Sequence, residues 1–264
     1  MKPHQIDSCL TLTLFDTLTT CCCISASNSL GGNKISGQLP WGHLSQLVGL
    51  THLDISRNFL NSTIGSRVGS LTNLESLQLD NNYRENQDGS VASHGMQGPI
   101  PGVIGNLHQL QELRLDNNFI DGTIPSSMGN LQSLVKLRME SNNLKSSIPS
   151  TLGNLANLQF LHLWSNYLES SISGQLGKLS QLQELFLDDN EITGTIPPEL
   201  GQLTSAVYIS LANNNLEGAI PPTFGMLSSL ERLDVQFNYM YGELPPQMAN
   251  LPALGKNLLC EAFL

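Results

Sequence analysis

The sequence predicts a solenoid of the α/β type, a right-handed superhelix with a parallel β-sheet on its concave side and irregular or 3-10 structure on its convex side. Two observations predict this fold class. The chain of 264 residues contains 47 leucines and 24 asparagines, and eight asparagines recur at a fixed spacing of 24 residues that is interrupted once. These are Asn58, Asn82, Asn118, Asn142, Asn166, Asn190, Asn214 and Asn238. A fixed period of this length indicates stacked structural repeats, of which we expect eight to nine.

Composition and charge exclude several classes of protein. Charged residues make up 13% of the chain, about half the share of an average soluble protein. The formal net charge of −10 has the wrong sign for a nucleic-acid partner. No apolar run of about 18 residues is present, so we expect no membrane span in this chain, although a longer parent protein could be membrane-anchored.

Each repeat contains a short segment in which leucines alternate with polar residues. Leu113 and Leu115 flank one polar residue, and Leu161 and Leu163 do the same two repeats later. Alternation of this kind predicts a strand with one buried face, and stacking one strand per repeat gives a parallel sheet. The recurring asparagine follows the strand, where its amide can bond backbone groups of a buried turn. No repeat can bury its leucines alone, so the repeats are expected to share one core.

The segments after the asparagines carry a more specific signal. Gly122-x-Ile124-Pro125, Gly194-x-Ile196-Pro197 and Gly218-x-Ile220-Pro221 recur in register. The sequence therefore resembles the leucine-rich repeat family, in its plant-type subclass with 24-residue repeats, over residues 30–254. Two repeats depart from the pattern because residues 61–65 and 169–173 lack the proline, and we expect looser turns there. Asn33 precedes Asn58 by 25 residues and is assigned to a degenerate ninth unit.

Three segments fall outside this regular pattern. Residues 1–29 form an N-terminal segment that we interpret as a possible remnant of a signal or cap. Residues 84–95 are a polar insertion, predicted to be a surface loop that is either merely tolerated or contacts a ligand. Residues 255–264 form a C-terminal end, interpreted as a truncated cap, because the repeat pattern stops after Leu254. The five cysteines lie in the two terminal segments, as remnants of caps or as free thiols: Cys9, Cys21, Cys22, Cys23 and Cys260.

Signals for cellular location are few. Residues 1–27 resemble a secretory signal only weakly, since the apolar run is short and acidic residues flank it. The single N-glycosylation acceptor is Asn61, in the triplet Asn61-Ser62-Thr63. Together with the family resemblance, these features predict an extracellular or cell-surface location.

The polar positions of the strands predict which side chains face the concave side. Five rings fall on three adjacent strands and are expected to form one exposed aromatic patch: Phe160, His162, Trp164, Phe186 and Tyr208. Large exposed rings are favoured anchors of interfaces, so we interpret the patch as a partner-binding site. The alternative is that the rings pack together only to shield the sheet. A mixed-charge field precedes the patch, and Arg114 and Arg138 within it are predicted to steer a partner.

The sequence gives little support for an enzyme. His52, Asp54 and Ser56 superficially resemble a hydrolase triad, but they lie side by side on one strand without the chain of orientation that a nucleophile needs. Nor does the sequence contain a Cys/His metal-ligand set. We therefore predict no catalytic residues, no cofactor and no metal.

The sequence thus predicts a non-catalytic recognition module that binds a protein, peptide or glycan on its concave face. The resemblance implies a role like that of the ectodomains of plant receptor-like proteins and kinases. Two alternatives remain open. One is a secreted enzyme inhibitor, since polygalacturonase-inhibiting proteins share this repeat. The other is a surface-adhesion or structural protein whose repeat face contacts a matrix or its own copies.

Overall fold

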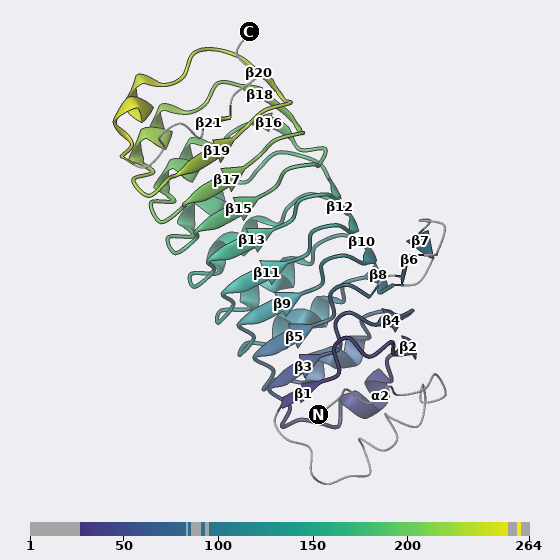
Figure 1. Cartoon of the computed structure of the whole chain (residues 1–264). Coiled ribbons are helices and arrows are strands. Elements are labelled where there is room, and N and C mark those ends of the chain that lie inside the picture. The colour runs from purple at the N-terminus through teal and green to yellow at the C-terminus, as the bar shows by residue number, and fades with distance from the viewer. Residues whose placement is uncertain (1–26, 83, 86–90, 93–94, 253–257, 260–264) are drawn as a thin grey trace, which may run out of the picture.

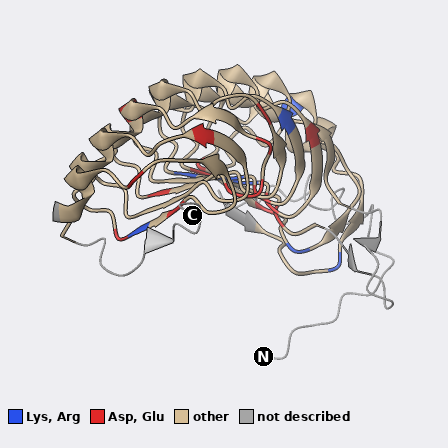
Figure 2. Ribbon diagram, turned by 90° about the horizontal axis from the view of Figure 1, so that it is seen from above, with Lys and Arg blue, Asp and Glu red and all other residues tan. Residues whose placement is uncertain are grey.

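The computed structural model describes residues 27–82, 84–85, 91–92, 95–252 and 258–259. The repeats stack into a curved solenoid that rises from the N-terminal to the C-terminal end (Figure 1). Seen from above, the coils form an arc with short helices along the outer edge and a sheet along the inner edge (Figure 2). The predicted leucine-rich repeat solenoid with a concave parallel sheet is therefore confirmed.

A ten-stranded parallel sheet lines the concave side, with one strand from each coil. Its register joins equivalent residues, so that Leu137 pairs with Leu161, and Leu161 with Leu185. The strand leucines whose burial the structure describes are at most 2% exposed and belong to one continuous core, as the alternating pattern predicts: Leu53, Leu77, Leu113, Leu137, Leu161, Leu185 and Leu233. The strands are β1 (Ser27–Ser29), β3 (His52–Asp54), β5 (Ser76–Gln78), β9 (Glu112–Arg114), β11 (Lys136–Arg138), β13 (Phe160–His162), β15 (Glu184–Phe186), β17 (Tyr208–Ser210), β19 (Arg232–Asp234) and β21 (Leu258–Leu259).

The recurring asparagines form a buried hydrogen-bond ladder behind this sheet. The side-chain Nδ2 of Asn142 donates to the backbone oxygens of Leu115, Met139 and Glu140 at 3.0–3.2 Å, and its Oδ1 accepts from the backbone N–H of Ile120 at 2.9 Å. One amide thus satisfies backbone groups of its own turn and of the coil before it, which confirms the predicted role. Asn33 donates to the backbone oxygens of Leu30 and Gly31 in the same way and so belongs to a ninth unit.

A second layer of short strands follows the asparagines, and the sequence analysis did not predict it. Among the described residues they pair in parallel with strands of neighbouring coils, in three separate groups along one side of the solenoid. They are β2 (Ser36–Gly37), β4 (Phe59–Leu60), β8 (Gln97–Pro99), β10 (Phe119–Gly122), β12 (Asn143–Ser146), β14 (Tyr167–Leu168), β16 (Thr193–Thr195), β18 (Asn215–Gly218) and β20 (Tyr239–Met240). Gly122, Gly194 and Gly218 adopt a left-handed φ of 76–79° here, whereas Ser146 occupies the same place with φ 72°. Glycine at this place of the repeat thus suits a left-handed backbone conformation that L residues adopt only at a cost.

Single turns of 3-10 helix cover the convex side, preceded by the short helix α2 (Trp41–Leu44). They are η1 (Ser66–Ser70), η2 (Gly102–Asn106), η3 (Ser126–Asn130), η4 (Ser150–Asn154), η5 (Gly174–Lys178), η6 (Pro198–Gln202), η7 (Pro222–Met226) and η8 (Pro246–Asn250). At Gly153, a Cβ atom would collide with the backbone oxygen of Gln175 in the next coil. Glycine at this place of the repeat therefore allows close packing of neighbouring coils. Gly65 and Ser173 precede η1 and η5 with the same extended dihedrals as the prolines elsewhere, so the expected looser turns are not seen.

The ends and the insertion also differ from the sequence expectations. β1 begins before residue 30, and β21 pairs in parallel with β19 after residue 254, so the sheet extends past both predicted limits of the solenoid. Within the insertion, β6 (Arg84–Glu85) and β7 (Val91–Ala92) form an antiparallel pair that stands out from the side of the solenoid (Figure 1). The five cysteines lie outside the described residues.

Candidate functional site on the concave face

The concave sheet presents three outward side chains per strand, at the positions that the register predicts. Many of them are nevertheless buried. Asp80, Asp116, Glu140 and His162 are only 1%, 3%, 6% and 5% exposed. The expectation that these positions are simply exposed was wrong, because neighbouring strands lie about 4.8 Å apart and the outward side chains cover one another.

Four rings on β13, β15 and β17 form a contiguous group, here called the aromatic row: Phe160, His162, Phe186 and Tyr208. His162 and Phe186 stack at 4.4 Å between ring centroids, with an interplanar angle of 18°. Phe160 meets His162, and Tyr208 meets Phe186, in edge-on contacts at 6.4 Å and 4.6 Å. Both geometries are favourable arrangements for aromatic pairs. Four of the five predicted patch residues are thus brought together.

Trp164 is the fifth predicted member, and it takes no part in the ring contacts of the aromatic row. Its ring is half-buried, and in the part of the chain that the structure describes no other ring stacks on it. The backbone oxygen of Trp164 accepts a hydrogen bond from Ser141 at 3.0 Å, which aligns this residue with the equivalent position of the preceding coil.

His162 is the polar centre of the aromatic row. Its Nε2 lies 2.8 Å from Glu184 Oε2, and its Nδ1 lies 4.0 Å from Glu140 Oε1. Burial lowers the pKa of His162 below its ordinary value, and the hydrogen bond with Glu184 opposes that shift. The structure therefore places His162 as a buried support of the ring stack, and not as the exposed contact that the sequence suggested.

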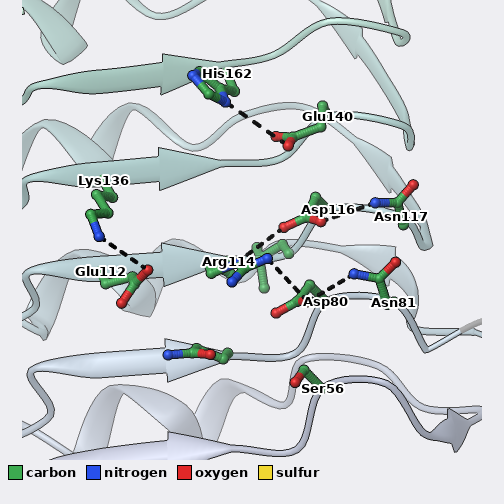
Figure 3. Close-up of polar contacts among 12 residues, drawn as sticks. Ser56, Asp80, Asn81, Glu112, Arg114, Asp116, Asn117, Lys136, Glu140 and His162 are labelled. Carbon is green, nitrogen blue, oxygen red and sulfur yellow. Dashed lines mark hydrogen bonds and ion pairs between the residues drawn. The ribbon is translucent and has the colours of Figure 1, made fainter. Parts of the chain in front are cut away.

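N-terminal to the row lies a group of three buried acids around one partly buried arginine, here called the charged zone: Asp80, Arg114, Asp116 and Glu140 (Figure 3). Arg114 lies between two aspartates, with Nη2 3.3 Å from Asp80 Oδ2 and Nε 3.6 Å from Asp116 Oδ1. Burial, followed by the charge of Asp80, raises the pKa of Asp116. Arg114 is thus committed to pairs within the chain, although the sequence suggested a steering role for it.

Glu140 is the least compensated acid of the charged zone. Burial raises its pKa to about 7, and the charge of Asp116 adds to the shift. Its Oε2 is buried and makes no hydrogen bond with the described residues. Arg138 is half-buried and lowers the pKa of Glu140 by its charge, but it forms no ion pair with any described residue.

Sequence reasoning missed Arg232 as part of the site. Its guanidinium Cζ lies 4.7 Å from the centroid of the Tyr208 ring, and its Nη2 is 3.8 Å from Asp234 Oδ2. The aromatic row therefore ends in a cation–π contact. The sequence could have predicted this contact, because Arg232 is at an outward position directly beside Tyr208 on the neighbouring strand.

Among the outward positions that the structure describes, acidic side chains outnumber Lys and Arg two to one. The acidic residues at the outward positions are Asp54, Asp80, Glu112, Asp116, Glu140, Glu184, Asp188 and Asp234, and the basic ones are Arg114, Lys136, Arg138 and Arg232. The face thus concentrates the negative charge that the whole chain carries.

The other sequence candidates have local partners. Asp54 Oδ1 accepts from Ser56 Oγ at 2.7 Å, and His52 Nδ1 contacts Thr51 Oγ1 at 2.9 Å, so these three side chains do not form a relay. The described residues contain no group of three or more His, Cys, Asp and Glu placed to hold a metal ion. Asn61 is half-buried and its Oδ1 accepts from Gln97 Nε2 at 2.8 Å; its glycosylation stays a prediction.

Family comparisons agree with this architecture. A family model described as a leucine-rich repeat region matches residues 91–196, and one described as a leucine-rich repeat matches residues 205–227. The fold and the repeats define a leucine-rich repeat protein. The chain belongs to this family, in its plant-type form. No curated protein sequence matches the chain.

Several solved structures resemble the chain. The plant peptide hormone receptor RGFR1, solved with RGF2, is 31% identical over 82% of this chain and 33% of its own, with a TM-score of 0.76. The ectodomain of the Arabidopsis thaliana receptor kinase GASSHO1/SCHENGEN3, solved with CASPARIAN STRIP INTEGRITY FACTOR 2, is 31% identical over 87% of this chain and 26% of its own, with a TM-score of 0.78. The Arabidopsis receptor kinase HAESA, solved with the peptide hormone IDA and the co-receptor SERK1, is 34% identical over 83% of this chain and 35% of its own, with a TM-score of 0.75. The chain spans about a third or less of each of these receptor chains.

No helix among the described residues combines the length and the apolar character needed to cross a membrane.

Proposed function

We propose that the chain is a non-catalytic, extracellular recognition module of the receptor-like type, and that it binds a peptide on its concave face across the aromatic row and Trp164. The observation that carries the proposal is the continuous contact from His162 through Phe186 to Tyr208 on three adjacent strands. A rigid sheet presents these rings already ordered, so little conformational entropy is lost on binding.

The similar receptor structures support the choice of a peptide ligand, because their names record complexes with peptide hormones or similar factors. The chain shares its fold with them over the matched parts. Half-buried apolar surface comes from four rings: Phe160, Phe186, Tyr208 and Trp164. Of the two arginines predicted to steer a partner, Arg138 is the one without an ion pair in the described part of the chain.

A selection experiment tests the proposal. The immobilised chain would be screened against a displayed library of linear peptides, and selected peptides would be measured against three variants. We expect Phe186→Ala and Trp164→Ala to weaken binding about tenfold or more, as for central aromatic anchors. Met226→Ala is the matched control, since Met226 is 58% exposed on the convex turn η7 and should leave binding unchanged.

Other outcomes would contradict the proposal. Peptides whose affinity falls with Met226→Ala but not with Phe186→Ala would place recognition on the convex side. A chain that selects no peptide but blocks a glycan-degrading enzyme would support the inhibitor alternative instead. Self-association that disappears with Trp164→Ala would support adhesion.

A further inference from the structure

Trp164 lies between two acidic residues of the concave face. Glu140, Trp164 and Asp188 occupy the same position in three consecutive coils. Backbone hydrogen bonds fix this alignment, because Ser141 N–H donates to the oxygen of Trp164 and Ser165 N–H donates to the oxygen of Asp188, both at 3.0 Å. Neighbouring strands of a sheet are about 4.8 Å apart, so one acid flanks the indole on each side.

These two acids lack the cationic partner that the acids of the preceding coils have. Asp80 and Asp116 share Arg114, at 3.3 Å and 3.6 Å. Within the described residues, neither Glu140 nor Asp188 pairs with a lysine or arginine, and Glu140 Oε2 is buried without a hydrogen bond. Burial raises the pKa of both carboxyls, as expected for desolvated acids. The charges of Arg138 and Arg114 oppose the shift at Glu140 without forming an ion pair with it, and a hydrogen bond with Ser210 opposes the shift at Asp188.

The same face already holds a guanidinium by an aromatic ring and an acid. Arg232 lies over Tyr208 at 4.7 Å and is 3.8 Å from Asp234. Trp164 offers the better ring for this interaction and two acids in place of one, but no lysine or arginine of the described residues forms a cation–π contact with its ring. A guanidinium suits such a place because it stacks on an aromatic plane and directs several N–H donors sideways.

We propose that Trp164, Glu140 and Asp188 form a subsite for an arginine side chain of the bound peptide. The inference rests on the proposed function and names the ligand chemistry of the same face. The guanidinium would stack on the indole and donate hydrogen bonds to the two carboxylates. The excess of acidic over basic side chains on the concave face favours a basic peptide for the same reason.

The test uses N-acetyl-arginine amide as the probe and N-acetyl-citrulline amide as its uncharged counterpart. The two indole N–H resonances of the chain report separately, because Trp41 is buried and donates its Nε1–H to the backbone oxygen of Thr63 at 2.7 Å. At pH 8, where Glu140 is mostly ionised, we expect the arginine amide to shift the Trp164 resonance in a saturable manner and to leave Trp41 unmoved. The citrulline amide should bind at least about tenfold more weakly, a difference of roughly 1.4 kcal/mol.

The variant Glu140→Gln combined with Asp188→Asn keeps the shapes of both side chains and should reduce arginine-amide affinity about tenfold. An unchanged Trp41 resonance would verify that the variant is folded. Glu112→Gln, on the same face beside Lys136, is the matched control and should bind as the parent does. Equal affinity for arginine and citrulline amides, or a Trp164 resonance that does not respond, would overturn the subsite.

A peptide from the selection experiment separates this inference from the proposed function. Loss of binding with Phe186→Ala, together with full tolerance of arginine-to-citrulline replacement, would leave concave recognition standing and overturn the subsite. Peptides that bind away from the concave face would overturn the proposed function, while the amide titration still decides the subsite.

Discussion

The charged zone and the aromatic row lie on the same sheet, one directly after the other, and they fill the same outward positions by different means. In the charged zone, Arg114 pairs with two acids that are almost fully buried. In the aromatic row, the ring of Phe186 stacks on the buried His162, and a hydrogen bond with Glu184 compensates the loss of hydration of the imidazole. The first solution depends on charge balance, whereas the second depends on apolar contact.

This difference predicts which zone tolerates change. Removing one member of a buried ion pair leaves an uncompensated charge, which is costly. Removing one ring from a half-buried stack loses contact area only. The charged zone is therefore the more fragile part of the face, and the aromatic row is the part that can present apolar surface to a partner.

The largest effect is expected from Arg114→Leu. The substitution leaves Asp80 and Asp116 buried without their cation and should lower the free energy of unfolding by about 3 kcal/mol at pH 7. Denaturant unfolding followed by circular dichroism measures it. Arg67→Leu is the control and should change stability by less than about 0.5 kcal/mol, because Arg67 is exposed on η1 and forms no ion pair among the described residues. Equal losses for the two variants would remove the distinction between the zones.

The next largest effect concerns Glu140 and pH. Its folded pKa of about 7 lies above the ordinary value of 4.5, so the folded state holds the proton more tightly. Glu140 therefore costs stability progressively as pH rises from about 4.5 to 7, and the full cost of roughly 3 kcal/mol is present above pH 7. Glu140→Gln should be more stable than the parent at pH 8 by up to this amount, and the advantage should vanish near pH 4.5.

Paired unfolding curves at several pH values check this prediction. The groups that act on Glu140 are His162, Asp116, Arg138 and Arg114, and all are retained in the variant. Glu112→Gln serves as the control, since Glu112 is only partly buried and pairs with Lys136 at 3.9 Å. A stability difference between Glu140→Gln and the parent that does not depend on pH would contradict the assignment of Glu140 as a desolvated acid.

A smaller effect is expected from Phe186→Ala. The ring is half-buried between His162 and Tyr208, so its loss should cost about 1–2 kcal/mol, below the cost of a fully buried phenylalanine. Phe237→Ala is the aromatic control, because Phe237 is 60% exposed and should cost less than about 0.5 kcal/mol. A cost for Phe186→Ala as small as for the control would show that the row is not a packed unit.

The smallest effect is expected from Arg232→Gln. Its cation–π contact is partly exposed and should contribute about 0.5 kcal/mol. The charge of Arg232 lowers the pKa of Tyr208, against the burial that raises it, so the substitution should raise that pKa further. Spectroscopic titration of the tyrosines detects this shift, and Arg232→Lys should restore part of it. An unchanged titration would contradict the placement of Arg232 over the ring.

Much of the scaffold was predictable, because the repeat forces equivalent residues into equivalent places. The 24-residue period of the asparagines located the strands, the core leucines and the hydrogen-bond ladder, and Asn142 makes the bonds that its position implied. The second layer of strands was not predictable in the same way. Its strands are two to four residues long and carry no apolar alternation, so coil-to-coil backbone pairing defines them.

The candidate site was predictable in its residues and less so in their exposure. Register placed Phe160, Phe186 and Tyr208 on one face, and the structure brings their rings together with His162. Register does not reveal how neighbouring side chains cover one another, so His162 was expected to be exposed but is buried. Likewise, Arg114 was expected to be available to a partner but pairs with Asp80 and Asp116, one of which lies in another repeat.

Amide hydrogen exchange of the chain, with and without a selected peptide, tests the central claim most directly. The account predicts slower exchange on binding in residues 160–164, 184–188 and 208–212, which carry the aromatic row and Trp164. The 3-10 turns η4 (Ser150–Asn154), η5 (Gly174–Lys178) and η6 (Pro198–Gln202) should be unaffected, because they lie on the convex side. Protection confined to those turns, with none on the concave strands, would contradict recognition by the concave face.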